Sequence, residues 1–304
     1  MTLRLKKAIF PVAGLGARFL PVTKAIPKEM LPMVDKPLIQ YAVEEAIAAG
    51  FTEIIFITSE TKRPIEDYFD FNIELETKLG LQKKNELLEI VRNILPSHLR
   101  CAYIRQSKPL GLGHAILCAE PFVGNEAFAV ILADDLIDAK PKNCLQVMVD
   151  VFKETQHSIV AVNLFEKKQA EQYGVVKSKE KIAGQSYFEL EAIVEKPKPE
   201  DAPSNHGIVG RYILTPGIFQ CLNTIFPGKH GEYQLTDAID ALIKKESVSA
   251  MKIPGKHYDC GDKVGYLEAT IAYALQHPKL KNDFKAMLTR VFHHYCESDE
   301  LSVD

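Results

Sequence analysis

The sequence predicts an α/β protein in which helices cover a mixed, mostly parallel sheet. Apolar, β-branched runs alternate with helical patterns through the first half of the chain, an order typical of parallel strands joined by right-handed crossovers. The second half contains shorter runs with hairpin-like spacing, which indicates antiparallel strands as well. Two helical patterns follow the last strand. We therefore expect one α/β domain with a helical C-terminal end.

The expected elements of the first half follow one another in a regular order. In residues 36–50, Ile39, Val43, Ala46 and Ile47 recur at helical spacing, and Gly50 marks the end of the helix. The unbroken apolar run at 53–59 is typical of a strand buried on both faces. By the same criteria we expect strands at 7–13, 53–59, 100–106, 127–135 and 158–165, and helices at 36–50, 111–122 and 143–155, with a helix-rich span at 62–95.

The second half is predicted to mix strands and helices. The two terminal helices begin at residue 262, and Val264, Leu267, Ile271 and Ala274 give the first of them an apolar stripe. The Pro-rich segment 195–207 is expected to be a loop. We expect strands at 174–178, 187–197, 207–215 and 247–261, and helices at 216–226, 234–246, 262–278 and 282–296.

The composition excludes several classes of protein. The 304 residues are 46% hydrophobic and 25% charged, as in an ordinary globular protein. A formal net charge of −3 argues against general nucleic-acid binding. No apolar run reaches the ~18 residues of a membrane span, and the N-terminus lacks a signal-peptide pattern. Six dispersed cysteines without a C-x-x-C pair fit reduced thiols. We expect a cytoplasmic protein that binds neither nucleic acid nor membranes.

A glycine-rich, cationic loop follows the first predicted strand. Gly14 and Gly16 occupy the first two positions of a dinucleotide-binding fingerprint, but Phe19 occupies the third, and no phosphate-loop lysine follows. Glycines allow backbone N–H groups to approach a phosphate, and Arg18 and Lys28 can neutralise it. The alternative is a tight strand-to-helix turn whose cations face solvent. The residues alone leave these two readings at even odds.

Acidic residues end several of the predicted strands. Asp134 and Asp135 follow a buried strand, at the edge where open parallel sheets bind ligands, and carboxylates there suit Mg²⁺. The alternative for these two is a strand-end turn. Asp259 also ends a strand, whereas Asp262 is placed to cap the first terminal helix. Gln106 offers a donor and an acceptor to the edge of a base, although taken alone it reads as a surface glutamine.

Taken together, these stretches resemble a known family. In chain order they are G-L-G-A-R-F-L-P, P-K-E-M-L-P, K-P-L-I-Q-Y, Q-S-K-P-L-G-L-G-H-A, L-A-D-D, Y-G-V-V, V-E-K-P, S-N-H-G-I-V-G-R-Y, G-E-Y-Q-L-T-D-A-I and Y-D-C-G-D. They closely resemble the bacterial UTP–glucose-1-phosphate uridylyltransferases, also called UDP-glucose pyrophosphorylases, of the sugar nucleotidyltransferase superfamily. The resemblance covers residues 5 to 275, and the P-K-E-M-L-P and G-L-G-H-A blocks are specific to this enzyme within the superfamily.

The resemblance implies a fold, a reaction and an assembly. The fold is Rossmann-like, the nucleotide-diphospho-sugar transferase fold. It forms a single domain over 1–304, with a catalytic core at 5–261 and terminal helices at 262–296 that make the contacts of a homodimer or homotetramer. The reaction joins UTP and glucose 1-phosphate into UDP-glucose and pyrophosphate with Mg²⁺ as cofactor. The sugar phosphate attacks the α-phosphorus in line, and since that phosphate is already ionised, no side chain needs to remove a proton.

The resemblance also implies the roles of individual residues. For catalysis it implies Arg18 and Lys28 beside the nucleotide phosphates and Lys196 on the sugar phosphate. For the metal it implies Asp134 and Asp259. For substrate binding it implies the phosphate loop Ala13, Gly14, Leu15 and Gly16, the uracil readers Gln106 and Gly111, the glucose-positioning Gly174, Glu195 and Asn205, and in addition Glu29 and Asp135.

The chain departs from the usual pattern of the family at three places. Relatives usually have Thr at Ala17, Pro at Ala133, and Leu-Ala at His206 and Gly207. The first change removes a hydroxyl, and the second loosens the turn that aims Asp134. No implied ligand or cation is missing, so we expect the activity to persist.

Three other functions remain as alternatives. A thymidylyltransferase making dTDP-glucose is the nearest, although those relatives usually carry K-Q-L-L-P or K-x-M-L-P where this chain has K-E-M-L-P. A nicotinamide oxidoreductase would need the missing third glycine and a suitably spaced acid, and Glu60 is at the wrong distance. A catalytically silent sugar-nucleotide sensor on the same fold would not need Asp134, Lys196 and Asp259.

Overall fold

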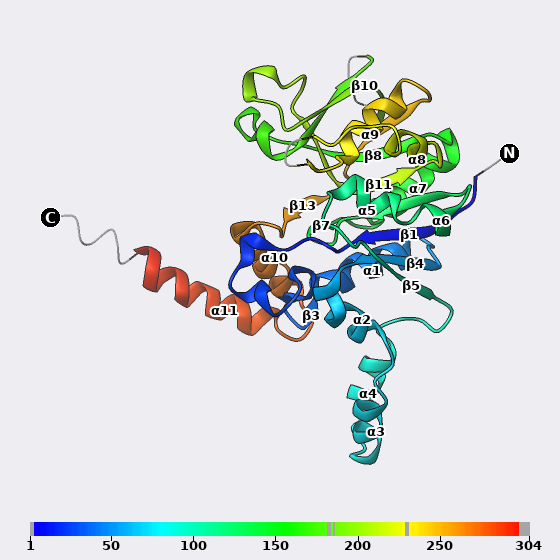
Figure 1. Ribbon diagram of the computed structural model, residues 1–304. Helices are drawn as coiled ribbons and strands as arrows, with labels where there is room; N and C mark the ends of the chain where they lie inside the picture. The colour runs from blue at the N-terminus through cyan, green and yellow to red at the C-terminus, as the bar shows by residue number, and fades with distance from the viewer. Residues whose placement is uncertain (1–2, 181–183, 185, 229–230, 298–304) are drawn as a thin grey trace.

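The computed structural model describes residues 3–180, 184, 186–228 and 231–297. A central sheet carries helices on both faces, and β1 lies inside it between β4 and β6 (Figure 1). The strands are β1 Leu5–Pro11, β2 Pro32–Met33, β3 Lys36–Pro37, β4 Glu53–Thr58, β5 Arg100–Arg105, β6 Ala127–Ile131, β7 Asp135–Asp138, β8 Ser158–Leu164, β9 Gly174–Ser178, β10 Tyr187–Glu195, β11 His206–Leu214, β12 Val248–Lys252 and β13 Lys256–Asp259.

The main sheet of the described residues has nine strands in the order β5-β4-β1-β6-β11-β8-β12-β10-β9. The pairs β5–β4, β4–β1, β1–β6 and β8–β12 are parallel, and β10 and β11 are antiparallel to their neighbours. The seven strands of this sheet other than β10 and β11 therefore run in one direction, so the sheet is mixed and mostly parallel, as predicted. β9 also pairs with β11 at Val175 and Gly207, which curls the second half of the sheet towards closure.

Helices cover both faces of this sheet, and others lie beyond it. The α-helices are α1 Leu38–Ala48, α2 Arg63–Phe69, α3 Ile73–Leu81, α4 Asn85–Arg92, α5 Leu112–Leu117, α6 Glu120–Val123, α7 Cys144–Thr155, α8 Gly217–Leu222, α9 Leu235–Ile243, α10 Lys263–Gln276 and α11 Lys281–Phe292. One apolar core lies between the sheet and α5, α8 and α9, and a second lies between the sheet and α1, α2 and α7. Figure 1 shows α3 and α4 projecting away from the sheet, and α11 leading away at the C-terminal end.

A third, smaller core lies where the strands of the first half end. It joins the β2–β3 hairpin, the β7–β13 pair and α10 through Met33, Leu38, Leu136 and Tyr258. The Asp262 carboxylate caps α10, as predicted. It accepts hydrogen bonds from the N–H groups of Val264 and Gly265. The terminal helix α10 is thus fixed beside the end of the sheet where the predicted site residues gather.

Several predicted elements were wrong in detail. The strand expected at 127–135 ends at Ile131, and Asp135 begins β7, which pairs with β13 outside the main sheet. The strand expected at 247–261 divides into β12 and β13 because the chain turns at Gly255, which packs against the backbone of Asp138. The helix expected at 111–122 divides into α5 and α6. None of the helices in the ranges that the structure describes is both long and apolar enough to cross a membrane.

Candidate active site

A cavity of about 540 Å³ opens at the carboxyl ends of β1, β5 and β6. This is the edge at which α/β sheets bind ligands. Its walls come from the loop after β1, the turn of Lys28, the loop between β5 and α5, and the end of β6. Of the predicted site residues it brings together Ala13, Gly14, Leu15, Gly16, Arg18, Lys28, Gln106, Gly111 and Asp134.

The glycine loop is held in shape by its own contacts. Gly16 has φ of 67°, and a Cβ there would approach Thr23 and Lys28 to between 3.1 and 3.3 Å. The Thr23 hydroxyl donates a hydrogen bond of 2.8 Å to the Gly16 carbonyl, which ties the loop to the following turns. Gly14 is exposed and has no atom within 4 Å of a Cβ position. The backbone at Gly14 is therefore open to a ligand that enters the cavity.

Lys28 and Asp134 form an ion pair in the cavity, Nζ to Oδ2, although they are 106 residues apart in the chain. Burial alone lowers the pKa of Lys28, but the charges of Asp134 and Glu29 outweigh it and raise that pKa. Burial alone raises the pKa of Asp134, and its contact with Lys28 lowers that pKa overall. Both groups are therefore charged at neutral pH.

Asp134 and Asp259 meet beside Gly261. A Cβ on Gly261 would lie 3.0 Å from an oxygen of each carboxylate and 3.3 Å from Arg18 Nη2. The two oxygens are therefore at most about 6 Å apart, twice 3.0 Å. Asp259 Oδ1 accepts a hydrogen bond of 2.9 Å from the Gly261 N–H. Burial, then the charge of Asp135 and to a lesser degree that of Asp134, raise the pKa of Asp259. The carboxylate of Asp259 is therefore repelled by both neighbouring acids.

This pair of carboxylates fits Mg²⁺. The ion commonly takes one or two protein carboxylates and completes its shell with water and substrate phosphates. No group of three or more His, Cys, Asp or Glu side chains placed to hold a metal is found in the described part of the chain. A two-carboxylate site that leaves positions open for phosphate oxygens is consistent with that finding.

The loop between β5 and α5 forms the wall opposite Lys28. Gly111 has φ of 92°, and a Cβ there would lie 2.9 Å from Glu232 Cβ and 3.0 Å from the Tyr233 carbonyl. The Gly113 N–H donates to that same carbonyl at 2.8 Å. Gln106 is 7% exposed, and its amide nitrogen donates to the Gly111 carbonyl at 3.1 Å. Close backbone contacts thus fix both predicted base-reading residues.

A second group of predicted residues gathers at the end of β10, outside the lining of this cavity. A Cβ on Gly174 would lie 3.3 Å from Glu195 Oε2, which accepts a hydrogen bond of 2.9 Å from Thr236. Lys196 Nζ lies 3.4 Å from Glu195 Oε1 and is half exposed. Lys196 has φ of 43°, in the left-handed region that non-glycine residues rarely adopt and that is enriched at functional sites.

The two groups approach each other through Tyr173. Tyr173 precedes Gly174, and after burial its pKa is raised chiefly by the charges of Asp259 and Asp135. Its ring also packs on that of Phe165, at 5.5 Å between centroids. Tyr173 is therefore near the strand-end acids as well as the β10 cluster.

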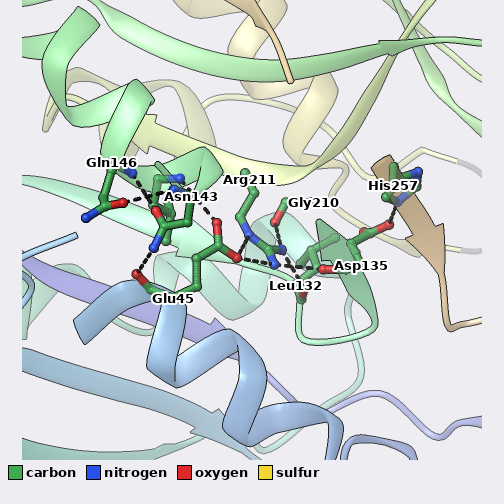
Figure 2. A network of polar contacts seen from close by, with 9 residues as sticks. Glu45, Leu132, Asp135, Asn143, Gln146, Gly210, Arg211 and His257 are labelled. Carbon is green, nitrogen blue, oxygen red and sulfur yellow. Dashed lines mark hydrogen bonds and ion pairs between the residues drawn. The ribbon is translucent and has the colours of Figure 1, made fainter. Parts of the chain in front are cut away.

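Asp135 contacts the protein and does not line the cavity. Its Oδ1 lies 2.5 Å from His257 Nε2 on β13. Figure 2 shows Arg211 between Glu45 on one side and the turn from Leu132 to Asp135 on the other. Arg211 is fully buried and donates to the carbonyls of Leu132 at 2.9 Å and Asp135 at 2.7 Å, and to Glu45 at 2.8 Å. This network fixes the turn that presents Asp134.

Two other predicted residues lie away from the cavity lining. Glu29 is 2% exposed and forms a buried ion pair with Lys62, 2.8 Å from Oε2 to Nζ. Burial raises the pKa of Glu29, although Lys62 and Lys28 lower it. Asn205 is exposed, and its carbonyl accepts from the Phe165 N–H at 3.1 Å.

Sequence reasoning missed several residues of the site. Glu232 lines the cavity, the Tyr233 backbone closes it, and Gly261 joins the two acids. Thr236 bonds to Glu195. All four residues lie in the motifs G-E-Y-Q-L-T-D-A-I and Y-D-C-G-D. Their place in motifs that resemble those of the family is the signal that could have identified them.

The fold and the site define a nucleotide-binding transferase in which a glycine loop, a lysine and strand-end acids surround one cavity. Comparison with known families agrees, since the nucleotidyl transferase family matches residues 7–276. The chain belongs to the nucleotidyl transferase family, and its relatives place it among the UTP–glucose-1-phosphate uridylyltransferases.

Three comparisons support this placement. A UTP–glucose-1-phosphate uridylyltransferase from Streptococcus pyogenes serotype M1 is 46% identical over 291 residues, 95% of this chain and 96% of the relative. The UTP-bound enzyme of Acinetobacter baumannii superposes with a TM-score of 0.88 at 43% identity, over 94% of this chain and 99% of that chain. A UDP-glucose pyrophosphorylase complexed with UDP-glucose gives a TM-score of 0.82 at 45% identity, over 90% and 100%. The predicted family is confirmed.

Proposed function

We propose that this chain transfers the uridylyl group of UTP to glucose 1-phosphate, forming UDP-glucose and pyrophosphate. The observation with the most weight is the meeting of the glycine loop, Lys28 and Asp134 in one cavity, in a chain 46% identical to an enzyme of this activity over 95% of its length. An oxygen of the sugar phosphate bonds to the α-phosphorus of UTP. The bond from that phosphorus to the bridging oxygen breaks, and the oxygen leaves with its electron pair as pyrophosphate.

The chain's main task is to bring two anions together. A phosphate monoester has a second pKa near ~6, so the attacking oxygen is ionised at neutral pH and needs no general base. Arg18 and Lys28 neutralise the nucleotide phosphates, while Lys196 binds the sugar phosphate. The backbone of Ala13 to Gly16 approaches the phosphates directly.

Mg²⁺ is the cofactor that the acid pair fits, with Asp134 and Asp259 as its protein ligands. When bound, it neutralises phosphate charge and stabilises the transition state electrostatically. Lys28 forms an ion pair with Asp134 in the cavity. We infer that Lys28 exchanges this carboxylate for a phosphate when the nucleotide enters.

The remaining predicted residues serve recognition. Gln106 and Gly111 read the uracil from one wall. Gly174 and Glu195, with Asn205, position the glucose near Lys196. Glu29 and Asp135 support the substrates indirectly, since their carboxylates face Lys62 and His257.

Pyrophosphate release tests the proposal. Purified protein is given UTP or dTTP with glucose 1-phosphate or with another sugar 1-phosphate, with and without Mg²⁺. We expect release that needs Mg²⁺ and is fastest with UTP and glucose 1-phosphate. Faster turnover of dTTP would instead indicate a thymidylyltransferase. Binding of UDP-glucose without any pyrophosphate release would indicate a sensor.

We also infer a homodimer or homotetramer in which α10 and α11 contact the neighbouring subunit. Val264, Leu267, Val291 and Phe292 are between 42% and 73% exposed on these helices, and their apolar side chains could be buried against a neighbouring subunit. Light scattering after size-exclusion chromatography measures the mass in solution. A monomer at micromolar concentration would contradict this inference.

A further inference from the structure

His114 on α5 contacts the side chain that reads the base but has no role in the reaction proposed above. Its Nδ1 lies 2.9 Å from the Gln106 amide nitrogen, and the same Nδ1 lies 3.9 Å from the Cys118 sulfur. The same Gln106 nitrogen lies 3.1 Å from the Gly111 carbonyl oxygen. One end of the Gln106 amide therefore faces two protein partners at once.

The chemistry of these partners fixes the orientation of the amide. The Gly111 carbonyl can only accept a hydrogen bond, so the amide group facing it must be the NH₂. That NH₂ also faces His114 Nδ1, which must then be an unprotonated acceptor with the ring proton on Nε2. Burial lowers the pKa of His114, which favours this neutral ring at neutral pH. A proton on Nδ1 would place two donors against each other.

The amide oxygen of Gln106 is then left for the ligand. Gln106 lines the cavity, and no hydrogen bond to its Oε1 is present in the described ranges of the chain. A carboxamide oxygen can only accept. It therefore matches a base whose ring nitrogen carries a hydrogen, as N3 of uracil does, and opposes a base whose corresponding nitrogen is an acceptor, as in cytosine.

We propose that His114 is a positioning residue that sets nucleotide specificity by holding the Gln106 amide with its oxygen towards the base. The proposal rests on the proposed function in one respect, that Gln106 reads the base of the bound nucleotide. It predicts discrimination of UTP from CTP, two nucleotides with the same ribose and triphosphate. It makes no distinction between uracil and thymine, which present the same N3–H.

Three variants test the proposal through the ratio of kcat/KM for UTP to that for CTP. His114→Phe keeps a ring but removes the acceptor, so the ratio should fall by about tenfold or more, the size of one good base contact. His114→Asn places an oxygen the same number of bonds from Cα as Nδ1, so it should keep most of the ratio. Cys118→Ala removes the longer contact of Nδ1 but leaves the acceptor that faces Gln106 in place, so it should leave the ratio unchanged.

An unchanged ratio in His114→Phe would overturn the proposal, as would equal losses in His114→Phe and His114→Asn. The tautomer gives a second measurement that needs no active variant. Long-range ¹H–¹⁵N correlation on the full chain, with the His114 signal assigned by its absence in His114→Asn, should show a proton on Nε2 only. A proton on Nδ1 would overturn the proposal. Failure of the wild-type protein to turn over UTP would instead contradict the proposed function, leaving the tautomer measurement informative.

Discussion

Lys28 and Asp134 form an ion pair in the cavity, although 106 residues separate them in the chain. Burial lowers the pKa of Lys28 and raises that of Asp134, but the contact between the two charges helps to reverse both effects. Under the proposed function Asp134 binds Mg²⁺ and Lys28 binds phosphate, so a nucleotide that enters with its cation offers both groups new partners. The ion pair would then have to break for turnover.

Asp134→Asn is predicted to lower kcat by ~100-fold or more, the range for loss of a major electrostatic stabiliser. The substitution keeps the side-chain shape but removes the charge that would hold the cation and Lys28. Steady-state pyrophosphate release measures the effect. Asp138→Asn is the matched control, because Asp138 ends the strand β7 that follows Asp134, and it accepts from Gln276 outside the cavity lining. Near-normal turnover by Asp134→Asn would contradict the assignment.

Asp259→Asn is predicted to stabilise the metal-free protein while lowering activity. The charge of Asp135, and to a lesser degree that of Asp134, oppose ionisation of Asp259, so a neutral amide removes repulsion. The amide oxygen can still accept from the Gly261 N–H. Thermal unfolding at neutral pH should give a higher Tm for the variant without Mg²⁺, and a smaller Tm rise on adding Mg²⁺ with UTP. An unchanged ligand-induced rise would exclude Asp259 from the metal site.

Arg211 and Glu45 form the buried support behind the acids, and removing one partner is predicted to be costly. Glu45→Ala leaves a buried guanidinium uncompensated, which should lower the free energy of unfolding by about 3–5 kcal/mol. Arg211 also holds the carbonyls of Leu132 and Asp135, so kcat should fall as the turn loosens. Urea unfolding and turnover measure the two effects.

The exposed ion pair Lys142–Asp150, 2.7 Å from Nζ to Oδ2, provides the control for Glu45→Ala. Solvent screens such a pair, so Lys142→Ala should change stability far less than Glu45→Ala. The double variant Glu45→Met with Arg211→Met should recover part of the loss, because it removes both charges together. Equal effects of Glu45→Ala and Lys142→Ala would show that the buried pair has no special role.

The sequence predicted the elements whose signals are local. The first-half strands and α1 follow from apolar periodicity, and Asp134 was found because a buried strand ends just before it. The pairing of β7 with β13 was missed because it joins residues more than a hundred positions apart. Arg211 was missed for the same reason, since it lies in an apolar strand and its partner Glu45 is 166 residues away. Long-range polar contacts leave no local pattern.

His206 and Gly207, where the resemblance leads us to expect Leu-Ala, each make distinctive contacts in the structure. A Cβ on Gly207 would lie 2.9 Å from Tyr173 and 3.0 Å from Phe165, so the aromatic packing here requires glycine. His206 is 8% exposed, and its buried Nδ1 has no hydrogen-bond partner in the described residues. Its ring packs edge-on against Phe188 at 5.6 Å between centroids. His206 is therefore a polar group in an apolar position.

His206→Leu is predicted to raise stability, and by more in acid than at neutral pH. Burial, and then the charge of Lys252, lower the pKa of His206 in the folded protein. The unfolded chain, with a histidine pKa near ~6.5, gains the proton first, so the wild type loses stability as pH falls below that value. Leucine cannot lose stability in this way. Urea unfolding of both proteins at pH 7.5 and pH 5.5, about one unit either side of ~6.5, measures the difference. An advantage that stays equal at both pH values would show that the imidazole is not held neutral by its surroundings.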